Sequence, residues 1–283
     1  MKTPVYSRLR QNREIRLLVR ADDMGSCHAA NEACIQCFRK GIVRSVEVMV
    51  PGPWYAEAVK MLKENPDLDV GVHLTLTSEW EFYKWGPVTH APSLVDKHGH
   101  FFPMNSQRPD FPPNTGFLDA KPKLDEVEKE LDAQIEIALT DLPQTSHLSL
   151  HMNTAGATPE LTKIVKRLSE EYYLPLEAPM AKAVSSLGMM GETLEKKELL
   201  LIKIIKSLTP GTWIVIDHPG LDSEEMSSWA ELPGTGSPIY GLVNKDRAAI
   251  TQAFTSDRVK QAIHIRGIHL INHKDYYTEK GIL

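Results

Sequence analysis

Short apolar segments alternate with helical segments in the first quarter of the chain, and this alternation restricts the fold more than any other feature. Strands are predicted over residues 16–19, 45–50 and 68–75, and helices over residues 26–41 and 54–63. Repeats of strand, helix and strand favour a parallel sheet, whose functional side chains gather at the carboxyl ends of the strands.

The same alternation continues beyond residue 122. Apolar residues spaced three and four apart predict an amphipathic helix over residues 124–139. The further predicted elements are a strand over 146–153, a helix opening at 158–160, a short strand over 172–179, a helix over 195–208, a strand over 212–217, helices over 246–254 and 256–265, and a last strand over 268–272. The pattern indicates an α/β protein.

Composition indicates a soluble globular protein with a reducing, cytoplasmic setting, unless a leader has been removed. The 283 residues are 42% hydrophobic and 24% charged, and the formal net charge is −5, which argues against nucleic-acid or acidic membrane surfaces. The first 15 residues are polar, and no apolar run is long enough to cross a bilayer. Cys27, Cys34 and Cys37 are expected to be buried small side chains rather than a bridge or a zinc site.

Two adjacent acids, Asp22 and Asp23, end the first apolar segment just before Gly25. Neighbouring side chains at a strand end point to opposite faces, so one acid can hold a metal while the other accepts a proton. Two buried carboxylates repel each other unless a cation lies between them. Taken alone, the pair is better explained as a solvated cap of the following helix, and only the residues further along the chain reverse that preference.

Imidazoles and a further acid lie at or near the ends of three other predicted strands. They are His73, His151 with His147, and Asp217 with His218. A lone histidine on a strand is usually a core residue, but several at successive strand ends favour a shared site. One carboxylate and two imidazoles leave coordination positions open for water and substrate, as a hydrolytic metal requires.

Residues 76–122 lack regular periodicity, which is typical of a functional loop or lid. The segment is rich in aromatic residues, Trp80 and Trp85 among them. These rings could stack on the apolar faces of sugars, or they could pack the loop onto the rest of the protein. Both interpretations remain open at this point.

Several motifs together resemble the YdjC-like carbohydrate deacetylases, the family of chitooligosaccharide deacetylase. The matching motifs are Ala-Asp-Asp-Met-Gly at 21–25, Gly-Val-His-Leu-Thr-Leu-Thr at 71–77, Glu-Leu-Asp-Ala-Gln-Ile at 130–135, Ser-His-Leu-Ser-Leu-His at 146–151, Asp-His-Pro-Gly at 217–220 and Gly-Ile-His-Leu-Ile-Asn at 267–272. They follow the family order and span nearly the whole chain. Together they are far more specific than any one of them.

The resemblance implies one domain over residues 1–283, a (β/α) barrel of the glycoside hydrolase/deacetylase type, distorted or seven-stranded. It implies a divalent metal, Mg²⁺ or Zn²⁺, held by Asp23, His73 and His151. It also implies Asp22 as the base that takes a proton from the attacking water and His218 as the acid that protonates the leaving amine.

The implied reaction removes the acetyl group from an N-acetylated sugar or oligosaccharide, releasing acetate and an amino sugar. Trp80, Trp85 and Arg20 are the predicted substrate contacts. The predicted partner is a small-molecule or oligosaccharide substrate. A homodimer is left open, since the long loop could be donated across a dimer interface.

Three positions depart from the family pattern. Arg20 stands where Asn is frequent, Met24 where Phe is frequent, and Ser149 where the family pattern His-x-Asp-x-His has an acid. If that acid orients a metal ligand, its loss weakens metal affinity by roughly tenfold or more. Two alternatives follow: a metal-dependent phosphoesterase, for which Arg20 is the candidate phosphate contact, and a catalytically impaired carbohydrate-binding barrel, which Ser149 supports.

Overall fold

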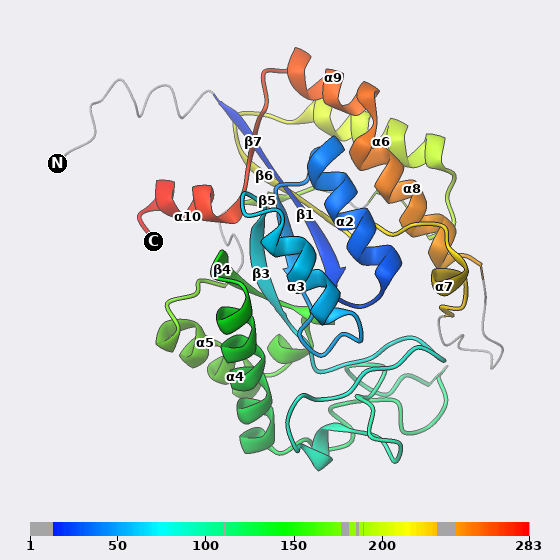
Figure 1. Cartoon of the computed structure of the whole chain (residues 1–283), viewed down its shortest axis with the longest axis vertical. Coiled ribbons are helices and arrows are strands. Elements are labelled where there is room, and N and C mark those ends of the chain that lie inside the picture. Colours follow the sequence, from blue (N-terminus) through cyan, green and yellow to red (C-terminus); the bar gives the residue numbers. More distant parts are fainter. Residues whose placement is uncertain are drawn as a thin grey trace.

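Seven parallel strands form one sheet in the computed structural model, which describes residues 14–109, 111–176, 181–184, 187–188, 190–230 and 241–282 (Figure 1). The strands are β1 (Ile15–Met24), β2 (Ser45–Val48), β3 (Asp69–Leu74), β4 (Thr145–Leu150), β5 (Lys182–Ala183), β6 (Gly211–Asp217) and β7 (His269–Ile271). Their order is β4-β3-β2-β1-β6-β5, and β7 also pairs with β1. Each pairing is parallel, as the alternation of strands and helices predicts.

The central strand β1 pairs with three others. It pairs with β6 from Ile15 to Ala21, with β7 near its start, and with β2 from Arg20 onward. Because β1 is covered on both faces, nearly all of its side chains are buried, which fits its continuous apolar sequence. The β1–β2 register shifts between Ala21 and Met24, where the two acids lie.

The sheet curves into an incomplete barrel. Leu176 forms an isolated parallel bridge with Leu148 of β4 at one edge, and β5 pairs with β6 at the other edge. Since Leu176 and Lys182 are only a few residues apart in the sequence, these two edges can be separated by no more than the reach of a short extended segment. The predicted α/β class and the seven-stranded, distorted barrel are confirmed.

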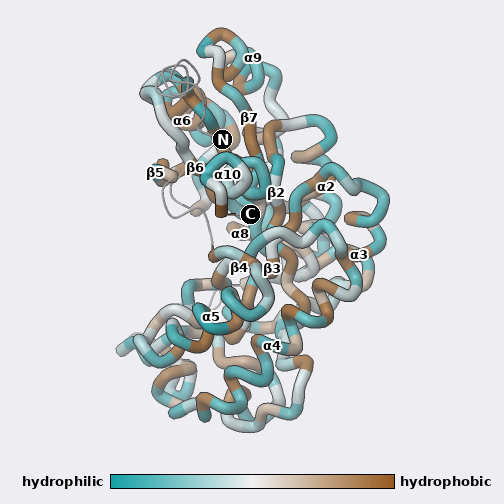
Figure 2. The backbone as a smooth tube through the Cα atoms, turned by 90° about the vertical axis from the view of Figure 1, so that its left-hand side faces the viewer, coloured by the Kyte–Doolittle hydropathy of each residue, from teal (hydrophilic) through white to brown (hydrophobic). Residues whose placement is uncertain are grey.

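Helices flank the sheet (Figure 1). They are α2 (His28–Lys40), α3 (Tyr55–Lys63), α4 (Leu124–Asp141), α5 (Pro159–Glu171), α6 (Leu194–Ser207), α7 (Glu224–Ser227), α8 (Val243–Thr255), α9 (Asp257–Ile265) and α10 (His273–Lys280), with 3₁₀ turns η1 (Pro92–Leu94) and η2 (His151–Gly156). Figure 2 shows apolar and polar stretches alternating along the helices, as expected for helices that bury one face. In the part of the chain that is described, no helix is both long and apolar enough to cross a bilayer.

Two local predictions need correction. The helix predicted to start at residue 26 begins at His28: Cys27 caps α2, because its Sγ accepts from the backbone N–H of Ala30 at 3.3 Å, while the Ser26 hydroxyl donates to the Asp23 carbonyl. The strand predicted over 172–179 is reduced to the bridge at Leu176, and residues 177–180 lie outside the described residues. The prediction that the three cysteines are buried and unbridged is confirmed.

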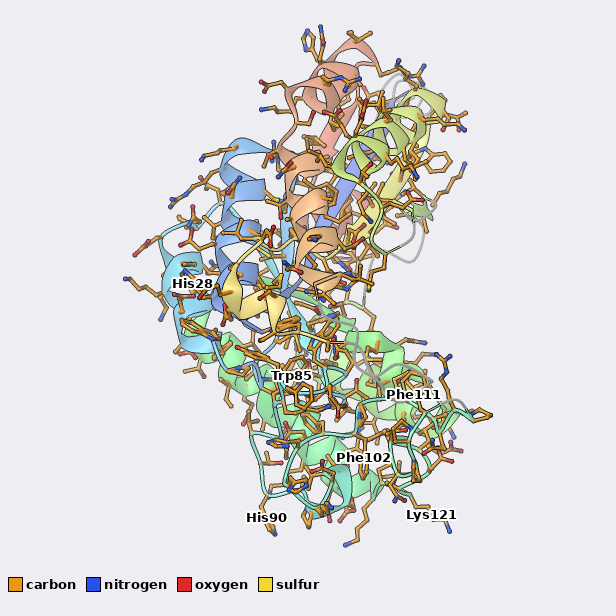
Figure 3. All side chains as sticks on the ribbon, turned by 90° about the vertical axis from the view of Figure 1, so that its right-hand side faces the viewer. His28, Trp85, His90, Phe102, Phe111 and Lys121 are labelled. Atoms are coloured by element: carbon orange, nitrogen blue, oxygen red, sulfur yellow. The ribbon has the colours of Figure 1, made fainter. Side chains whose placement is uncertain are left out.

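The aromatic loop packs onto the barrel over much of its length. Trp85, Phe101 and Phe117 are buried in an apolar cluster that also contains residues of α4 and α5. Figure 3 places Trp85 inside this region, with His90 and Lys121 at its outer edge. The packing interpretation of the loop therefore holds for these rings.

Candidate metal centre and active site

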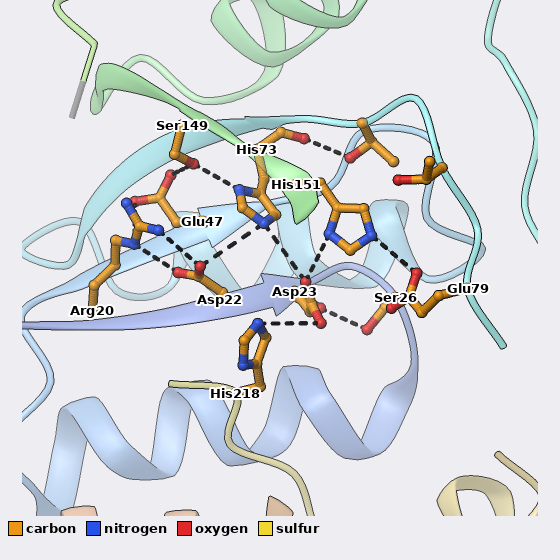
Figure 4. A network of polar contacts seen from close by, with 12 residues as sticks. Arg20, Asp22, Asp23, Ser26, Glu47, His73, Glu79, Ser149, His151 and His218 are labelled. Carbon is orange, nitrogen blue, oxygen red and sulfur yellow. Dashed lines mark hydrogen bonds and ion pairs between the residues drawn. The ribbon is translucent and has the colours of Figure 1, made fainter. Parts of the chain in front are cut away.

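The two acids at the end of β1 point to different partners (Figure 4). Asp23 has a φ of 68°, the left-handed region that a non-glycine residue enters at a cost on the order of 1–3 kcal/mol. The hydroxyl of Ser26 donates to the Asp23 carbonyl at 2.6 Å, and the N–H of Gly25 donates to Asn31 at 2.7 Å. These bonds hold the turn that separates Asp23 from Asp22.

Asp23, His73 and His151 form a buried cluster. Oδ1 of Asp23 lies 3.3 Å from Nδ1 of His151 and 3.7 Å from Nε2 of His73. One ligand atom from each residue lies within 4.8 Å of the other two, and each side chain is 3% exposed. The structure thus brings together the three residues predicted to hold a metal.

The atoms of this cluster fit a divalent cation. Among the described residues, Oδ1 of Asp23 has no hydrogen-bond partner although it is buried. Burial, together with the nearby charge of His151, lowers the pKa of His73 to about 3, so this imidazole is neutral. A buried carboxylate oxygen that faces ring nitrogens without a hydrogen bond is costly, and a cation held between them removes that cost. One carboxylate with two imidazoles is a donor set suited to zinc.

Glu79 lies behind His151. Its Oε2 is 3.0 Å from Nε2 of His151, on the opposite side of the ring from Asp23. Burial lowers the pKa of His151, but Glu79 and Asp23 outweigh burial and raise it to about 10. A carboxylate behind a ligating imidazole fixes the ring and its tautomer. Glu79 is not among the residues predicted for the site, although it stands two residues after the Gly-Val-His-Leu-Thr-Leu-Thr motif.

Arg247 of α8 binds the other oxygen of Asp23. Its Nη2 donates to Oδ2 at 2.9 Å, and its guanidinium lies over the rings of Trp80 and Trp229 at 5.3 and 5.1 Å from their centroids. Burial raises the pKa of Asp23, but the charges of His218 and Arg247 hold it well below its usual value. Asp23 is therefore ionised. Arg247 is not among the predicted site residues either, because no motif connects it to Asp23.

Arg20, a predicted substrate contact, forms an ion pair with Asp22 instead. Its Nε and Nη2 donate to the two oxygens of Asp22 at 2.7 and 2.8 Å, a two-point ion pair buried in the barrel. Oδ2 of Asp22 lies 3.9 Å from Nε2 of His73, so Asp22 is beside the cluster without belonging to it.

His218 approaches the cluster from the end of β6. Its Nε2 is 4.0 Å from Oδ2 of Asp23, and its Nδ1 is 3.7 Å from Oδ1 of Asp217. Burial lowers the pKa of His218, but Asp23 and then Asp217 outweigh burial and raise it above its ordinary value. The side chain is still 43% exposed, so water screens these interactions and can exchange protons with the ring.

A cavity of about 300 Å³ opens onto the cluster. Its walls include Asp23, Glu79, Trp80, His151, Asp217, His218 and Arg247. Of the three predicted substrate contacts, Trp80 lines this cavity. Trp85 is 3% exposed and its indole N–H donates to the Thr77 carbonyl at 2.8 Å, while Arg20 is committed to Asp22. The structure places both side chains away from the described walls of the cavity.

The chain folds into an α/β barrel with a candidate metal-binding cluster of three residues at its strand ends, and comparisons with known proteins show the family to which it belongs. The model of the family described as YdjC-like protein matches residues 16–264. A carbohydrate deacetylase of Thermus thermophilus is 33% identical over 81% of this chain and 76% of its own. A carbohydrate deacetylase of Enterococcus faecalis is 26% identical over 92% of this chain and 97% of its own.

A solved structure has the same fold. The crystal structure of a protein from Enterococcus faecalis V583, named for cellobiose-phosphate cleavage, superposes with a TM-score of 0.71 at 24% identity. The match covers 93% of this chain and 98% of that one. The chain belongs to the YdjC-like family, as the motifs indicate.

Proposed function

We propose that this protein is a metal-dependent carbohydrate N-deacetylase that hydrolyses the acetamide of an N-acetylated sugar to acetate and an amino sugar. The observation that carries the proposal is the buried cluster of Asp23, His73 and His151 beside a cavity. The carbohydrate deacetylases among its relatives support the substrate class.

Asp23, His73 and His151 would hold the metal through Oδ1, Nε2 and Nδ1, the atoms that face one another. We propose Zn²⁺ ahead of Mg²⁺, because Mg²⁺ prefers oxygen ligands and two of the three donors are imidazoles. When bound, the metal supplies a Lewis acid that polarises the acetyl carbonyl and acidifies water.

Asp22 is the proposed general base. The two-point ion pair with Arg20 uses one lone pair on each oxygen of Asp22, so each oxygen retains another that can accept a proton from water. The guanidinium also fixes the direction of the carboxylate, which is the geometric requirement for a base. Asp22 lies beside His73, close enough to act on a water at the cluster.

His218 is the proposed general acid. Its raised pKa favours the protonated ring, the form that can donate a proton, and the ring lines the cavity where the sugar nitrogen would leave. Asp217 faces Nδ1 of the ring, which leaves Nε2 directed toward Asp23 and the cluster.

The cavity wall favours a sugar amide over a phosphoester. Trp80 adds an apolar ring to the cavity wall, although the ring is 4% exposed and lies under the guanidinium of Arg247. The guanidinium on the described wall, Arg247, is neutralised by Asp23, and Arg20 is neutralised by Asp22. A phosphate group binds best to an arginine that is not already ion-paired with a carboxylate.

A reducing, cytoplasmic setting is part of the proposal. The three cysteines carry free thiols, as expected in a reducing compartment. Fractionation of cells that produce the protein, followed by immunodetection, tests this location.

Acetate release tests the proposed activity. The purified protein, analysed for bound metal, is assayed on N-acetylglucosamine oligomers and their phosphorylated forms, with phosphate release followed in parallel. Acetate release that a chelator abolishes and Zn²⁺ restores supports the proposal. Phosphate release, or sugar binding without acetate, contradicts it. Asp257→Ala is a matched control for carboxylate variants, because that side chain is 97% exposed on α9.

A further inference from the structure

Ser149, which stands where the family pattern has an acid, lies between His73 and a carboxylate from another strand. Its Oγ is 2.7 Å from Nδ1 of His73, and its hydroxyl donates to Oε2 of Glu47 (Figure 4). His73 and Ser149 are direct partners in the pairing of β3 with β4, while Glu47 comes from β2. The three side chains are buried, so the contacts are protected from water.

Glu47 reaches Ser149 by passing over Gly71 of β3. Gly71 is the direct partner of Glu47 in the pairing of β2 with β3. A Cβ on Gly71 would collide with Oε2 of Glu47 and with Nε2 of His147. The glycine therefore makes room for a side chain from β2 to contact a residue of β4.

We propose that Glu47, acting through the hydroxyl of Ser149, is the carboxylate that orients the metal ligand His73. Glu47 is a positioning residue in this role. The inference rests on the proposed metal centre and adds a residue that neither the motifs nor the family pattern assigns.

The hydrogen bonds between Glu47, Ser149 and His73 fix which nitrogen of His73 carries the proton. An ionised Glu47 can only accept, so the Ser149 hydroxyl donates to it, and the Ser149 oxygen must then accept from Nδ1–H of His73. A neutral imidazole with its proton on Nδ1 has a lone pair on Nε2, which faces Asp23 at 3.7 Å. Without Glu47 the hydroxyl could turn and donate to Nδ1. The ring proton would then lie on Nε2, the atom required for the metal.

Two cations keep Glu47 ionised. Oε1 of Glu47 lies 2.7 Å from Nε2 of His147 and 3.7 Å from Nε of Arg20. Burial raises the pKa of Glu47, but His147 and Arg20 outweigh it and lower the pKa below its usual value. The acceptor role of Glu47 therefore follows from its surroundings.

His147 is a cation rather than a ligand of a second metal. Its Nε2 contacts Glu47, and its Nδ1 lies 2.8 Å from the oxygen of Ser146, whose hydroxyl donates to Asp69 at 2.6 Å. Both ring nitrogens thus donate, and the ring stacks on His273 with centroids 3.8 Å apart. Although Glu47, His147 and His273 are close enough to suggest a metal site, no lone pair of His147 is left for an ion.

Both imidazoles of the metal cluster consequently have a carboxylate behind them. Glu79 contacts His151 directly, and Glu47 contacts His73 through one hydroxyl. The serine at position 149 moves the acid to β2 without removing it. Ser149 is therefore no argument for a catalytically impaired barrel.

Zinc affinity tests the inference. The dissociation constant for Zn²⁺ is measured by calorimetry against a competing chelator for the wild type, Ser149→Ala, Glu47→Gln and the double variant. We expect each single variant to bind Zn²⁺ about 10- to 100-fold more weakly, the usual effect of losing an orienting partner. The double variant should bind Zn²⁺ no more weakly than the weaker-binding single variant, because both residues act through one chain of hydrogen bonds.

Ser45→Ala is the control. It removes a buried hydroxyl that bonds to Asp69 and not to His73, and its affinity for Zn²⁺ should stay within about twofold of wild type.

The tautomer of His73 gives a second readout that a general loss of stability does not move. Nitrogen-15 NMR of the metal-free protein should show the proton on Nδ1 in the wild type and in Ser45→Ala, and a changed tautomer in Ser149→Ala. Glu47→Gln leaves His147 without its nearest counter-charge. If Glu47→Gln does not fold for that reason, the result for Ser149→Ala decides the test.

Two results would overturn the proposed role of Glu47 and Ser149 in orienting His73. One is wild-type zinc affinity in Ser149→Ala, and the other is an unchanged His73 tautomer in that variant. A wild-type chain that binds no zinc would overturn the proposed function instead. Since the NMR measurement needs no metal, it still tests whether Glu47 and Ser149 orient His73 in that case.

Discussion

Arg20 and Asp22 form a buried two-point ion pair, with N–O distances of 2.7 and 2.8 Å, at the point where β1 enters the active site. The pair has two consequences. It neutralises a carboxylate inside the barrel, and it fixes the direction in which that carboxylate accepts a proton.

Replacing Arg20 by Lys should therefore lower turnover without removing the metal. The ammonium carries the same charge but offers a point contact in place of a planar fork, so Asp22 gains freedom to turn. Arg20→Ala should go further and destabilise the fold by about 3–5 kcal/mol, since it leaves a buried charge unpaired. Urea unfolding, zinc content and kcat measured on the same preparations check this. Full turnover in Arg20→Lys would show that the orientation of Asp22 is unimportant.

Substitutions should distinguish the role of Asp22 as the base from the role of Asp23 as a metal ligand. Asp22→Asn keeps the shape and one acceptor for Arg20 but removes the base, so turnover should fall by about 10²- to 10⁴-fold while zinc content stays near one per chain. Asp23→Ala removes a ligand and should lose the zinc itself. Metal analysis beside acetate release distinguishes the two. If both variants retain full activity, the assignment of roles to this pair is wrong.

Zinc binding should release a proton near neutral pH. In the metal-free protein the pKa of His151 is raised to about 10, so the ring is protonated at pH 7, and the Nδ1 that faces Asp23 must lose its proton to coordinate. Apparent affinity should accordingly rise by about tenfold per pH unit as long as the pH stays below this pKa. Calorimetry in two buffers with different ionisation enthalpies measures the proton directly.

Glu79→Gln provides the matched control for this proton. It removes the negative charge behind His151 but retains a side chain of the same shape. The pKa of His151 should fall toward its ordinary value, and the number of protons released at pH 7 should decrease. Equal proton release in the two proteins would mean that the proton comes from another group.

The position of most site residues followed from the sequence for one physical reason. Parallel strands share the edge at which their carboxyl ends lie, so residues that follow different strands must meet there. The strand pattern alone predicts that Asp22, Asp23, His73, His151 and His218 lie together, and in the structure each of them is within hydrogen-bond or ion-pair range of another. Their roles as ligands, base and acid stay predictions.

Other contacts were invisible in the sequence because they depend on how side chains cross between elements. Arg247 reaches Asp23 from a helix that begins more than 200 residues later, and no periodicity connects the two. In the sequence, Glu47 is an ordinary position of an alternating strand. Only the structure shows that the missing side chain of Gly71 leaves room for Glu47 to contact β4. Composition allows Trp85 either to stack on a sugar or to pack its loop onto the barrel, and only the structure shows that the packing buries its ring.

Gly71→Ala tests that path directly. The added methyl group would collide with Glu47 and His147, and overpacking of this kind costs roughly 1–3 kcal/mol. Glu47 would have to withdraw from Ser149 to relieve the collision, so zinc affinity should fall together with stability. Urea unfolding and zinc calorimetry of the variant measure both effects.

The collision with Glu47 can be separated from a general effect of alanine at this position by repeating the substitution in a Glu47→Ala background. There the longer side chain is absent, so Gly71→Ala should cost less free energy of unfolding than in the wild type, and it should leave zinc affinity where Glu47→Ala alone has set it. An equal cost in both backgrounds would mean that His147 or the backbone, rather than Glu47, requires the glycine. In that case Gly71 would matter for packing and not for the orientation of His73.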